Sequence, residues 1–244
     1  MTTLKSNVIE PSTGTNLSLG AAGDLIEVSN DALQLNTWKD SGGNTLFTSD
    51  GAGNVSSVNI ALAAGGPNLI STQTVSGAAT LDFTSGIDNT YDKYMFVWLN
   101  VNPGTNAPDF GFQGSTDGGS NYNTTMTTTT WRAYKKEADN SNEGVAYATG
   151  QDQAQGTGYQ AIGHYLSNAT GHSTSGILYI FAPSNTTYVK HFYSRGATVD
   201  GSVATHINDW YAAGYFNTAS AINAISFKMT SGDFDGTIAM YGCR

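Results

Sequence analysis

The chain has 244 residues, enough for one large domain or for a domain of ordinary size with an appendage. Charged residues make up 12%, about half the share of an average soluble domain, and the formal net charge is −9. Nucleic-acid-binding proteins normally carry a basic face, so this composition argues against that class of protein. The aromatic content of 11% argues against a disordered chain, because these side chains supply large surfaces for burial.

The abundance of Gly, Ser, Thr and Asn disfavours long helices and suits strands joined by tight turns. The first residues, MTTLKSNVIEP, lack the apolar core of a signal peptide, and no apolar run approaches the ~20 residues of a membrane span. The one cysteine, Cys243, permits no disulfide within the chain. We therefore expect an all-β protein made in a cytoplasm, with neither secretion nor membrane insertion.

Residues 1–66 contain only short apolar bursts, separated by Gly, Ser, Asn or Asp. Leu17–Leu19, Ile26–Val28 and Leu33–Leu35 alternate with period two, as half-buried strands do. Each strand has too few apolar residues to offset the entropy of ordering. The sequence predicts an extended N-terminal β-arm that needs a partner. The arm is either a shaft of three copies around a threefold axis or a strap on another protein's surface.

Residues 67–244 follow a hinge of sequence ALAAGGP and predict a β-sandwich. The runs Tyr94–Leu99 and Ile177–Phe181 are apolar on both faces, so each is expected at the centre of a sheet. Roughly ten candidate strands separated by turn signals fit a jelly-roll-like sandwich. They are Leu69–Val75, Ala79–Phe83, Tyr94–Val101, Asp109–Gln113, Thr127–Ala133, Ile177–Phe181, Tyr188–Tyr193, Trp210–Phe216, Ile222–Lys228 and Gly236–Tyr241.

Three local features are less regular. Residues 137–175 are rich in Gly, Gln, Asn and Ser and are expected to be long surface loops, with a short helix around Tyr159–Leu166. The spacing of Ile222 and Ile225 breaks strict alternation, which indicates either a bent strand or one helical turn before it. His191 lies between Lys190 and Phe192 and is expected to face solvent or a subunit seam.

No catalytic motif is present. The run Gly114–Gly118 (GSTDG) has its serine one position too early for a nucleophile elbow, and no glycine precedes a lysine as in a P-loop. The four histidines do not have zinc-site spacing; convergence of His164 and His172 with Asp152 or Glu143 is the one cluster to weigh. We expect no catalytic residue, cofactor or metal ion.

The acidic residues occur mostly beside Gly or Asn, as in Asp50-Gly51, Asp117-Gly118 and Asp235-Gly236, and are expected to form turns. Ser231–Gly236 could offer calcium two carboxylates, but a hairpin turn before the last strand fits its length better. Aromatic side chains in polar loops can stack on the apolar faces of sugars. The candidates for glycan contact are Tyr122, Trp131, Tyr134, Tyr147, Tyr159 and Tyr165.

Two sets of residues resemble proteins of bacteriophage particles. Trp38–Asn59 (WKDSGGNTLFTSDGAGNVSSVN) resembles shaft-like segments of tail-fibre and other structural proteins of aquatic, particularly marine, phages. Leu81–Tyr94, Ser184–Lys190 and Phe234–Gly242 resemble a domain of virion structural proteins from the same phages. The resemblance implies location in a virion, and it brings no catalytic residues with it.

Three functions are compatible with this reading. The first is a non-enzymatic, homotrimeric tail fibre whose residues 1–66 hold other virion proteins and whose sandwich contacts host-surface glycans. The second is a capsid decoration or head-fibre protein that clamps and stabilises the capsid. The third, a glycan-degrading enzyme, has no motif in its favour.

Overall fold

The structure, a computed structural model, describes residues 37–40, 42–52, 54–58, 66–138, 141, 143–201 and 206–244. It divides into two compact units, Met1–Ala63 and Ala64–Arg244, which we describe separately. The fold is all-β, as predicted. Within the described ranges, the helical structure is the 3₁₀ turn η1 (Thr149–Gln151), and no helix there is long and apolar enough to cross a membrane. The predicted strands Leu17–Leu19, Ile26–Val28 and Leu33–Leu35 lie outside the described residues.

The described part of the N-terminal unit is a three-stranded antiparallel sheet of β1 (Thr37–Lys39), β2 (Thr45–Ser49) and β3 (Val55–Val58). Trp38 stacks on its register partner Phe47, with ring centroids 5.4 Å apart. Even so, the Trp38 side chain is 37% exposed, and Val55 is 57% exposed. This small sheet therefore leaves much of its apolar surface uncovered.

Aspartates form the turns of this unit by accepting hydrogen bonds from the following backbone. Asp40 Oδ1 accepts from the amide nitrogens of Gly42 (2.9 Å) and Asn44 (2.8 Å). Asp117, in the second unit, repeats the pattern by accepting from the Asn121 amide nitrogen at 2.9 Å. Hydrogen bonds from Ser115 and Asn121 lower the pKa of Asp117 to about 2. The predicted turn-forming role is confirmed at Asp117 and at Asp50, which accepts from the amide nitrogens of Ala52 and Asn54, whereas Asp40 was not among the predicted residues.

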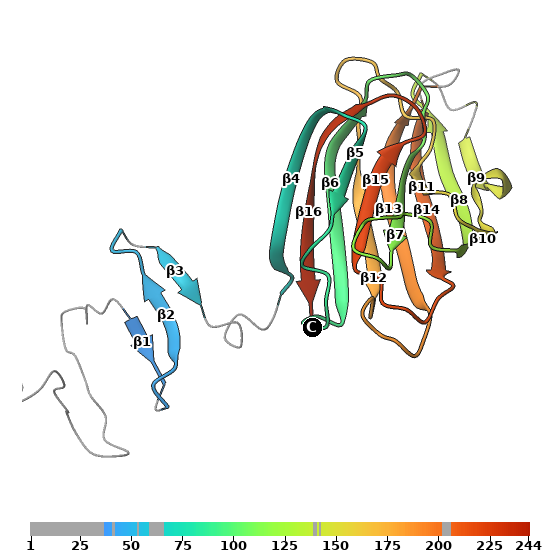
Figure 1. Ribbon diagram of the computed structural model, residues 1–244. Coiled ribbons are helices and arrows are strands. Elements are labelled where there is room, and N and C mark those ends of the chain that lie inside the picture. The colour runs from blue at the N-terminus through green and yellow to red at the C-terminus, as the bar shows by residue number, and fades with distance from the viewer. Residues whose placement is uncertain are drawn as a thin grey trace, which may run out of the picture. The chain divides into compact units, whose positions relative to one another are not determined.

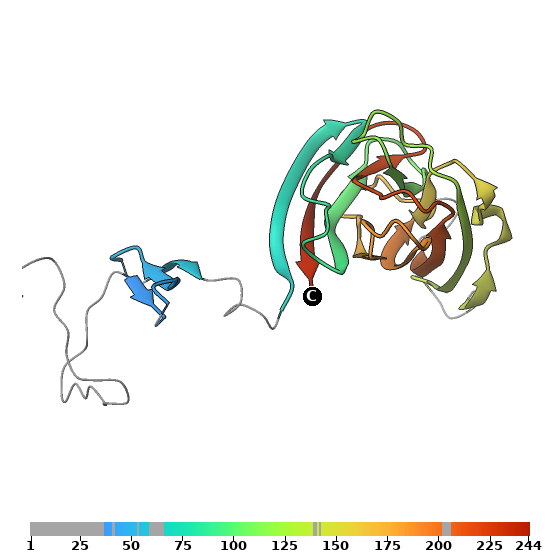
Figure 2. The same cartoon turned by 60° about the horizontal axis from the view of Figure 1, so that its bottom comes forward.

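The second unit is a two-layer β-sandwich (Figures 1 and 2). Its larger sheet has nine strands in the order β10-β8-β14-β13-β12-β6-β16-β4, with β9 also paired to β8. The bounds are β4 (Asn68–Ala78), β6 (Lys93–Pro103), β8 (Met126–Lys136), β9 (Glu143–Tyr147), β10 (Ala154–Gly156), β12 (Thr174–Phe181), β13 (Lys190–Asp200), β14 (His206–Phe216) and β16 (Phe234–Cys243).

The smaller sheet has four strands in the order β11-β7-β15-β5 and covers one face of the larger sheet (Figure 2). These strands are β5 (Thr80–Phe83), β7 (Phe110–Ser115), β11 (Gln160–Gly163) and β15 (Ala224–Met229). All pairings in both sheets are antiparallel. The predicted sandwich is confirmed, and a jelly-roll-like arrangement is compatible with it.

An aromatic cluster fills the space between the sheets. Phe96 and Trp98 of β6 meet Phe110 and Phe227 of the small sheet, with ring centroids 5.6–5.9 Å apart. All four side chains are fully buried. β6 lies between β12 and β16, and β12 lies between β13 and β6, so the two runs predicted to be central strands are central.

Residues 137–175 are only in part the predicted surface loops. Within them lie β9, β10 and β11, and the predicted helix around Tyr159–Leu166 is wrong. Gln160 and Ile162 of β11 are fully buried. The Gln160 amide donates to the carbonyls of Gln151 (3.1 Å) and Ala161 (3.0 Å), and its oxygen accepts from Thr128 Oγ1 (2.6 Å). A polar side chain can be buried when its hydrogen bonds are satisfied, which composition alone does not reveal.

Neither alternative for Ile222 is quite right. Ile222 precedes β15 and is fully buried without belonging to a strand or a helical turn. Its amide donates to the Pro183 carbonyl at 2.9 Å, and the amide of Asn223 donates to the Ser115 carbonyl at 2.9 Å. The segment is therefore tied to neighbouring loops, and regular alternation begins only at Ala224.

Candidate functional site

The larger sheet turns one face away from the small sheet, and we call this its outer face. Along β13 the side chains alternate strictly between buried and exposed. Phe192 and Ser194 point into the sandwich, whereas Tyr193 and Arg195 lie on the outer face. His191 is also exposed on this face, as the sequence predicted for it. Residues paired across antiparallel strands share a face, so the register identifies the rest.

Two cross-strand rows of large side chains run over the outer face. One row joins Leu69, Tyr241, Met95, Tyr179 and Tyr193 through successive register pairs from β4 to β13. The Tyr179 and Tyr193 rings lie 5.1 Å apart. Such cross-strand aromatic pairs leave an extended apolar surface on the side of the sheet that has no covering layer.

The second row lies one step along the strands. It joins Tyr147, Trp131, Tyr211, Arg195 and Ile177 from β9 to β12. The Trp131 and Tyr211 rings are stacked at 3.9 Å with an interplanar angle of 6°, and the Arg195 guanidinium lies 5.0 Å from the Tyr211 ring centre. The stack and the cation–π contact together form a flat, rigid platform.

Exposed apolar side chains of the described sandwich concentrate on this face. Those on it are Leu69, Leu99, Trp131, Val145, Tyr147, Tyr193 and Ile207; Tyr165 and Tyr188 lie elsewhere. Tyr193 also separates two shallow grooves of about 440 and 560 Å³, because it lines both. A contiguous exposed apolar surface on a folded protein usually marks an interaction site.

Charges on the outer face are few. Across the outward positions of β12, β13 and β14, the charged residues are Arg195 and Asp209. They form a bidentate pair with N–O distances of 2.9 and 2.8 Å. The Arg195 hydrogen bonds lower the pKa of Asp209, so the pair stays ionised through the neutral range. Lys93 of β6, the register partner of Phe181, adds one positive charge to this face, with its ammonium 5.5 Å from the Tyr179 ring centre. The face therefore carries little charge and no excess of negative charge, whereas the chain as a whole carries −9.

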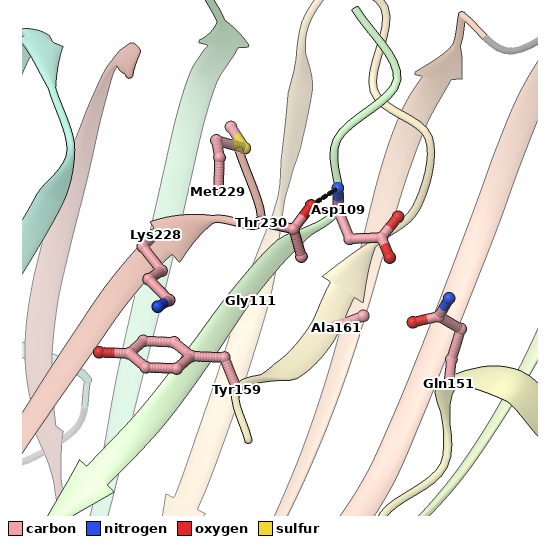
Figure 3. A pocket seen from close by; sticks show the side chains of 8 residues that line it. All are labelled: Asp109, Gly111, Gln151, Tyr159, Ala161, Lys228, Met229 and Thr230. Carbon is pink, nitrogen blue, oxygen red and sulfur yellow. Dashed lines mark hydrogen bonds between the residues drawn. The ribbon is translucent and has the colours of Figure 1, made fainter. Parts of the chain in front are cut away.

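A small pocket lies at the edge of the small sheet (Figure 3). Its volume is only about 40 Å³, room for about one water molecule. Lys228 and Tyr159 lie together on one side, with the ammonium 4.3 Å from the ring centre. Asp109 is committed elsewhere, because its carboxylate accepts from the Tyr165 amide at 3.0 Å and bonds to His164 at 2.6 Å. This pocket offers no room for an organic ligand.

The structure separates the six aromatic residues predicted to contact glycans. Trp131 and Tyr147 are adjacent on the outer face. Tyr134 lies one residue out of phase with them on β8, under the Arg132 guanidinium at 5.0 Å. Tyr159 is tied to Ser226 by its hydroxyl at 3.0 Å, and the Tyr165 ring is stacked on His164 at 3.7 Å. Glycan contact by any of them stays a prediction.

Tyr122, the sixth of these residues, has its hydroxyl group in an unfavourable environment. Its hydroxyl is buried without a hydrogen-bond partner among the described residues. Burial raises the pKa of Tyr122 to about 12, and the negative charge of Asp82 adds to the shift. A buried hydroxyl without a partner lowers stability by roughly 1–3 kcal/mol.

Tyr122→Phe is therefore expected to raise the free energy of unfolding by about 1 kcal/mol at neutral pH. Between pH 10.0 and about 12 the unfolded tyrosine loses its proton before the folded one, so wild-type stability falls with rising pH. The Tyr122→Phe variant has no hydroxyl to ionise at this position, so its free energy of unfolding should fall less than that of the wild type over this pH range. Urea unfolding at about pH 8 and about pH 11 measures both effects. An equal gain from Tyr188→Phe, an exposed-site control, would contradict the explanation.

The cluster considered from the sequence, of His164 and His172 with Asp152 or Glu143, does not form. His164 bonds to Asp109, and His172 Nδ1 lies 2.8 Å from Ser167 Oγ. Asp152 accepts from Thr130 and Tyr147, and Glu143 pairs with Lys135 at 2.6 Å. The described residues contain no group of three His, Cys, Asp or Glu side chains that could hold a metal ion.

Within the segment Ser231–Gly236, residues 231–233 form the predicted turn, and β16 begins at Phe234. Gly232 adopts the left-handed conformation with φ of 71°, and Asp235 Oδ1 accepts from the Gly77 amide at 2.7 Å. The carboxylate thus binds the end of β4, the strand paired with β16.

Sequence reasoning missed Tyr211, Arg195 and Asp209, which complete the outer face. The only signal available was period-two alternation in segments 190–200 and 206–216. Comparison with other proteins adds no further indication: no protein-family model, curated protein or solved structure matches the chain.

Proposed function

We propose that this chain is a non-enzymatic structural protein of a bacteriophage particle, the subunit of a short trimeric fibre. In the trimer, the outer face of the nine-stranded sheet is buried against further copies of the same chain. Residues 1–66 attach the fibre to other virion proteins, and the sandwich is directed toward the host surface. The phage setting comes from the resemblance of the sequence; the association comes from the physical properties of the outer face.

The observation that carries the proposal is the apolar, aromatic outer face, which carries few charges. Subunit interfaces are enriched in aromatic residues and depleted of charge at their centres, as this face is around Tyr193. Identical chains of charge −9 repel one another, and this repulsion is weakest at a face without an excess of negative charge. A second copy of this chain therefore fits this face better than a strongly charged partner does.

The pockets support a non-enzymatic role. Four pockets are relevant: the small pocket, the two grooves beside Tyr193, and a pocket between β8, β9 and η1. The small pocket is lined by one carboxylate, Asp109, and one groove by Asp209; the other two are lined by none. Glycoside hydrolysis by the usual mechanism needs two carboxylates on opposite sides of the scissile bond. Asp109 is bonded to His164 and Asp209 to Arg195, so both also have structural roles.

Sedimentation equilibrium of the full chain tests the association. The expected mass is that of three chains of 25.6 kDa, at micromolar concentration and moderate salt. A monomer would overturn the proposal. Quantitative gels of purified particles then decide the location: tens of copies or fewer fit a tail fibre, whereas hundreds would replace this proposal with the capsid-decoration alternative.

A further inference from the structure

A larger pocket lies where β8, β9 and η1 meet the segment that follows β11. Its volume is about 280 Å³, at the lower end of the range for small-ligand sites. The side chains that shape it are Arg132, Tyr147, Gln151, His164, Tyr165 and Trp210. Two of the predicted glycan-contact residues, Tyr147 and Tyr165, are thus brought together here from segments 18 residues apart in sequence.

The aromatic wall of this pocket is held rigidly. His164 is stacked on Tyr165 at 3.7 Å and lies 5.0 Å from Trp210. Trp210 is fully buried, and its indole nitrogen donates to the Ala161 carbonyl at 3.2 Å. Tyr165, in contrast, is 42% exposed. The wall therefore consists of two fixed rings, those of His164 and Trp210, and of the Tyr165 ring, which a ligand can reach.

The charged and polar side chains that line the pocket are held by partners that do not line it. Arg132 Nη1 donates to Asn208 Oδ1 at 3.3 Å and lies 3.6 Å from the buried carboxylate of Asp200. Asp109 holds His164 at Nδ1, so Nε2 is the ring nitrogen that remains for another partner. The Gln151 side chain adds one donor and one acceptor group. The pocket thus presents oriented hydrogen-bonding groups without an excess of either charge.

From this geometry we infer that the pocket binds one neutral pyranose residue. A sugar ring has an apolar C–H face that stacks on an aromatic ring, and a rim of hydroxyl groups that both donate and accept hydrogen bonds. The exposed Tyr165 ring suits the face, and Arg132, Gln151 and His164 suit the rim. The volume admits one ring and not a long chain. The inference rests on the proposed function, in which the sandwich meets host-surface glycans.

Saturation-transfer NMR with the full-length chain tests this site. The probes are the methyl glycosides of glucose, galactose, mannose and N-acetylglucosamine, with methyl glucuronoside as the carboxylated comparison. At least one neutral glycoside should receive magnetisation on the protons of one ring face. Tyr165→Asn should weaken its binding about tenfold. Asparagine tolerates the left-handed backbone at this position, where φ is 51°.

Two further variants keep the test specific. Gln151→Ala should also weaken binding, because it removes hydrogen-bonding groups from the rim. Tyr188→Asn should leave binding unchanged, because Tyr188 is 71% exposed and lies outside the pocket. Transfer to no neutral glycoside, transfer that survives both pocket variants, or tighter binding of the glucuronoside would overturn the inference.

Sedimentation of the same samples separates this inference from the proposed fibre. A trimer that binds no sugar leaves the fibre proposal standing and removes the pocket assignment. A monomer whose sugar binding is weakened by Tyr165→Asn supports the pocket assignment and overturns the fibre proposal.

Discussion

Replacing Gly176 with alanine is expected to lower the free energy of unfolding by about 3 kcal/mol. Gly176 on β12 pairs with Gly196 on β13, and the Trp98 indole of β6 lies across both. A Cβ at position 176 would overlap the indole and would lie 2.5 Å from the Arg195 carbonyl oxygen and 2.7 Å from Gly196 Cα.

The Trp98 indole cannot move away from a methyl group added at position 176. Trp98 is fully buried, and its Nε1 donates to Thr174 Oγ1 at 3.4 Å. Thr174 is held in turn by Thr198 Oγ1 at 2.9 Å and by the Ala197 carbonyl at 3.0 Å. An added methyl group must therefore displace backbone or a hydrogen-bonded network, and cores accommodate such overpacking poorly.

Urea unfolding at fixed protein concentration measures the effect, since the stability of an oligomer depends on concentration. The control is Gly144→Ala on β9, where the nearest atom to the new Cβ is Tyr134 Oη at 3.4 Å. That variant should change stability by less than about 1 kcal/mol. If Gly176→Ala behaved like the control, the indole would have to be far more mobile than its contacts indicate.

Tyr193→Asp is expected to dissociate the proposed trimer. Tyr193 stands at the centre of the outer face, where it separates the two grooves and contacts the Tyr179 ring. An aromatic residue at the centre of an interface commonly contributes 2 kcal/mol or more, which corresponds to roughly thirtyfold in the association constant of each contact. The new carboxylate would also be desolvated without a partner.

The variant should fold normally, because Tyr193 is 48% exposed in the single chain. Sedimentation should therefore show a folded monomer, with a far-ultraviolet circular dichroism spectrum like that of the wild type. The matched control is Tyr188→Asp, which introduces the same charge at a tyrosine outside the outer face and should leave the trimer intact. A trimer of Tyr193→Asp at low micromolar concentration would exclude this face as the subunit interface.

Much of the sandwich could be predicted from apolar runs. Tyr94–Leu99 and Ile177–Phe181 are apolar at every position, which correctly predicted strands at the centre of a sheet, although only one face of that sheet is covered within the sandwich. β13 was harder, because the prediction ended at Tyr193 and the strand continues to Asp200. Its second half, SRGATVD, lacks an apolar run, and it is held in place mainly by pairing with β12 and β14.

Lys190 and Tyr193 show why the orientation of the faces was less predictable. Lys190 is fully buried, and its ammonium donates to the carbonyls of Tyr188 (2.9 Å) and Thr218 (3.1 Å). Burial lowers the pKa of Lys190. Tyr193, the more apolar residue, faces outward. Side-chain polarity thus assigns these two residues to the wrong faces, and only the tertiary partners correct the assignment.

The candidate sites were less predictable than the fold. Trp131 and Tyr147 were chosen for their residue type, but their adjacency depends on pairing between β8 and β9, and β9 itself was expected to be a loop. The contact of His164 with Asp109 joins residues 55 positions apart. No local pattern predicts such a contact, since it follows from the packing of β7 beside β11.

The place of β16 in the large sheet has a consequence for how the sandwich forms. β16 is the last strand in the chain, yet it lies between β4 and β6, and its Gly242 pairs with Asn68 at the start of β4. On a ribosome, β4 would therefore wait for nearly the whole domain to be synthesised before its sheet neighbour emerged. Such long-range pairing slows folding. The same adjacency makes the sandwich a natural candidate for circular permutation, with the new termini placed in an exposed loop such as that around Tyr188.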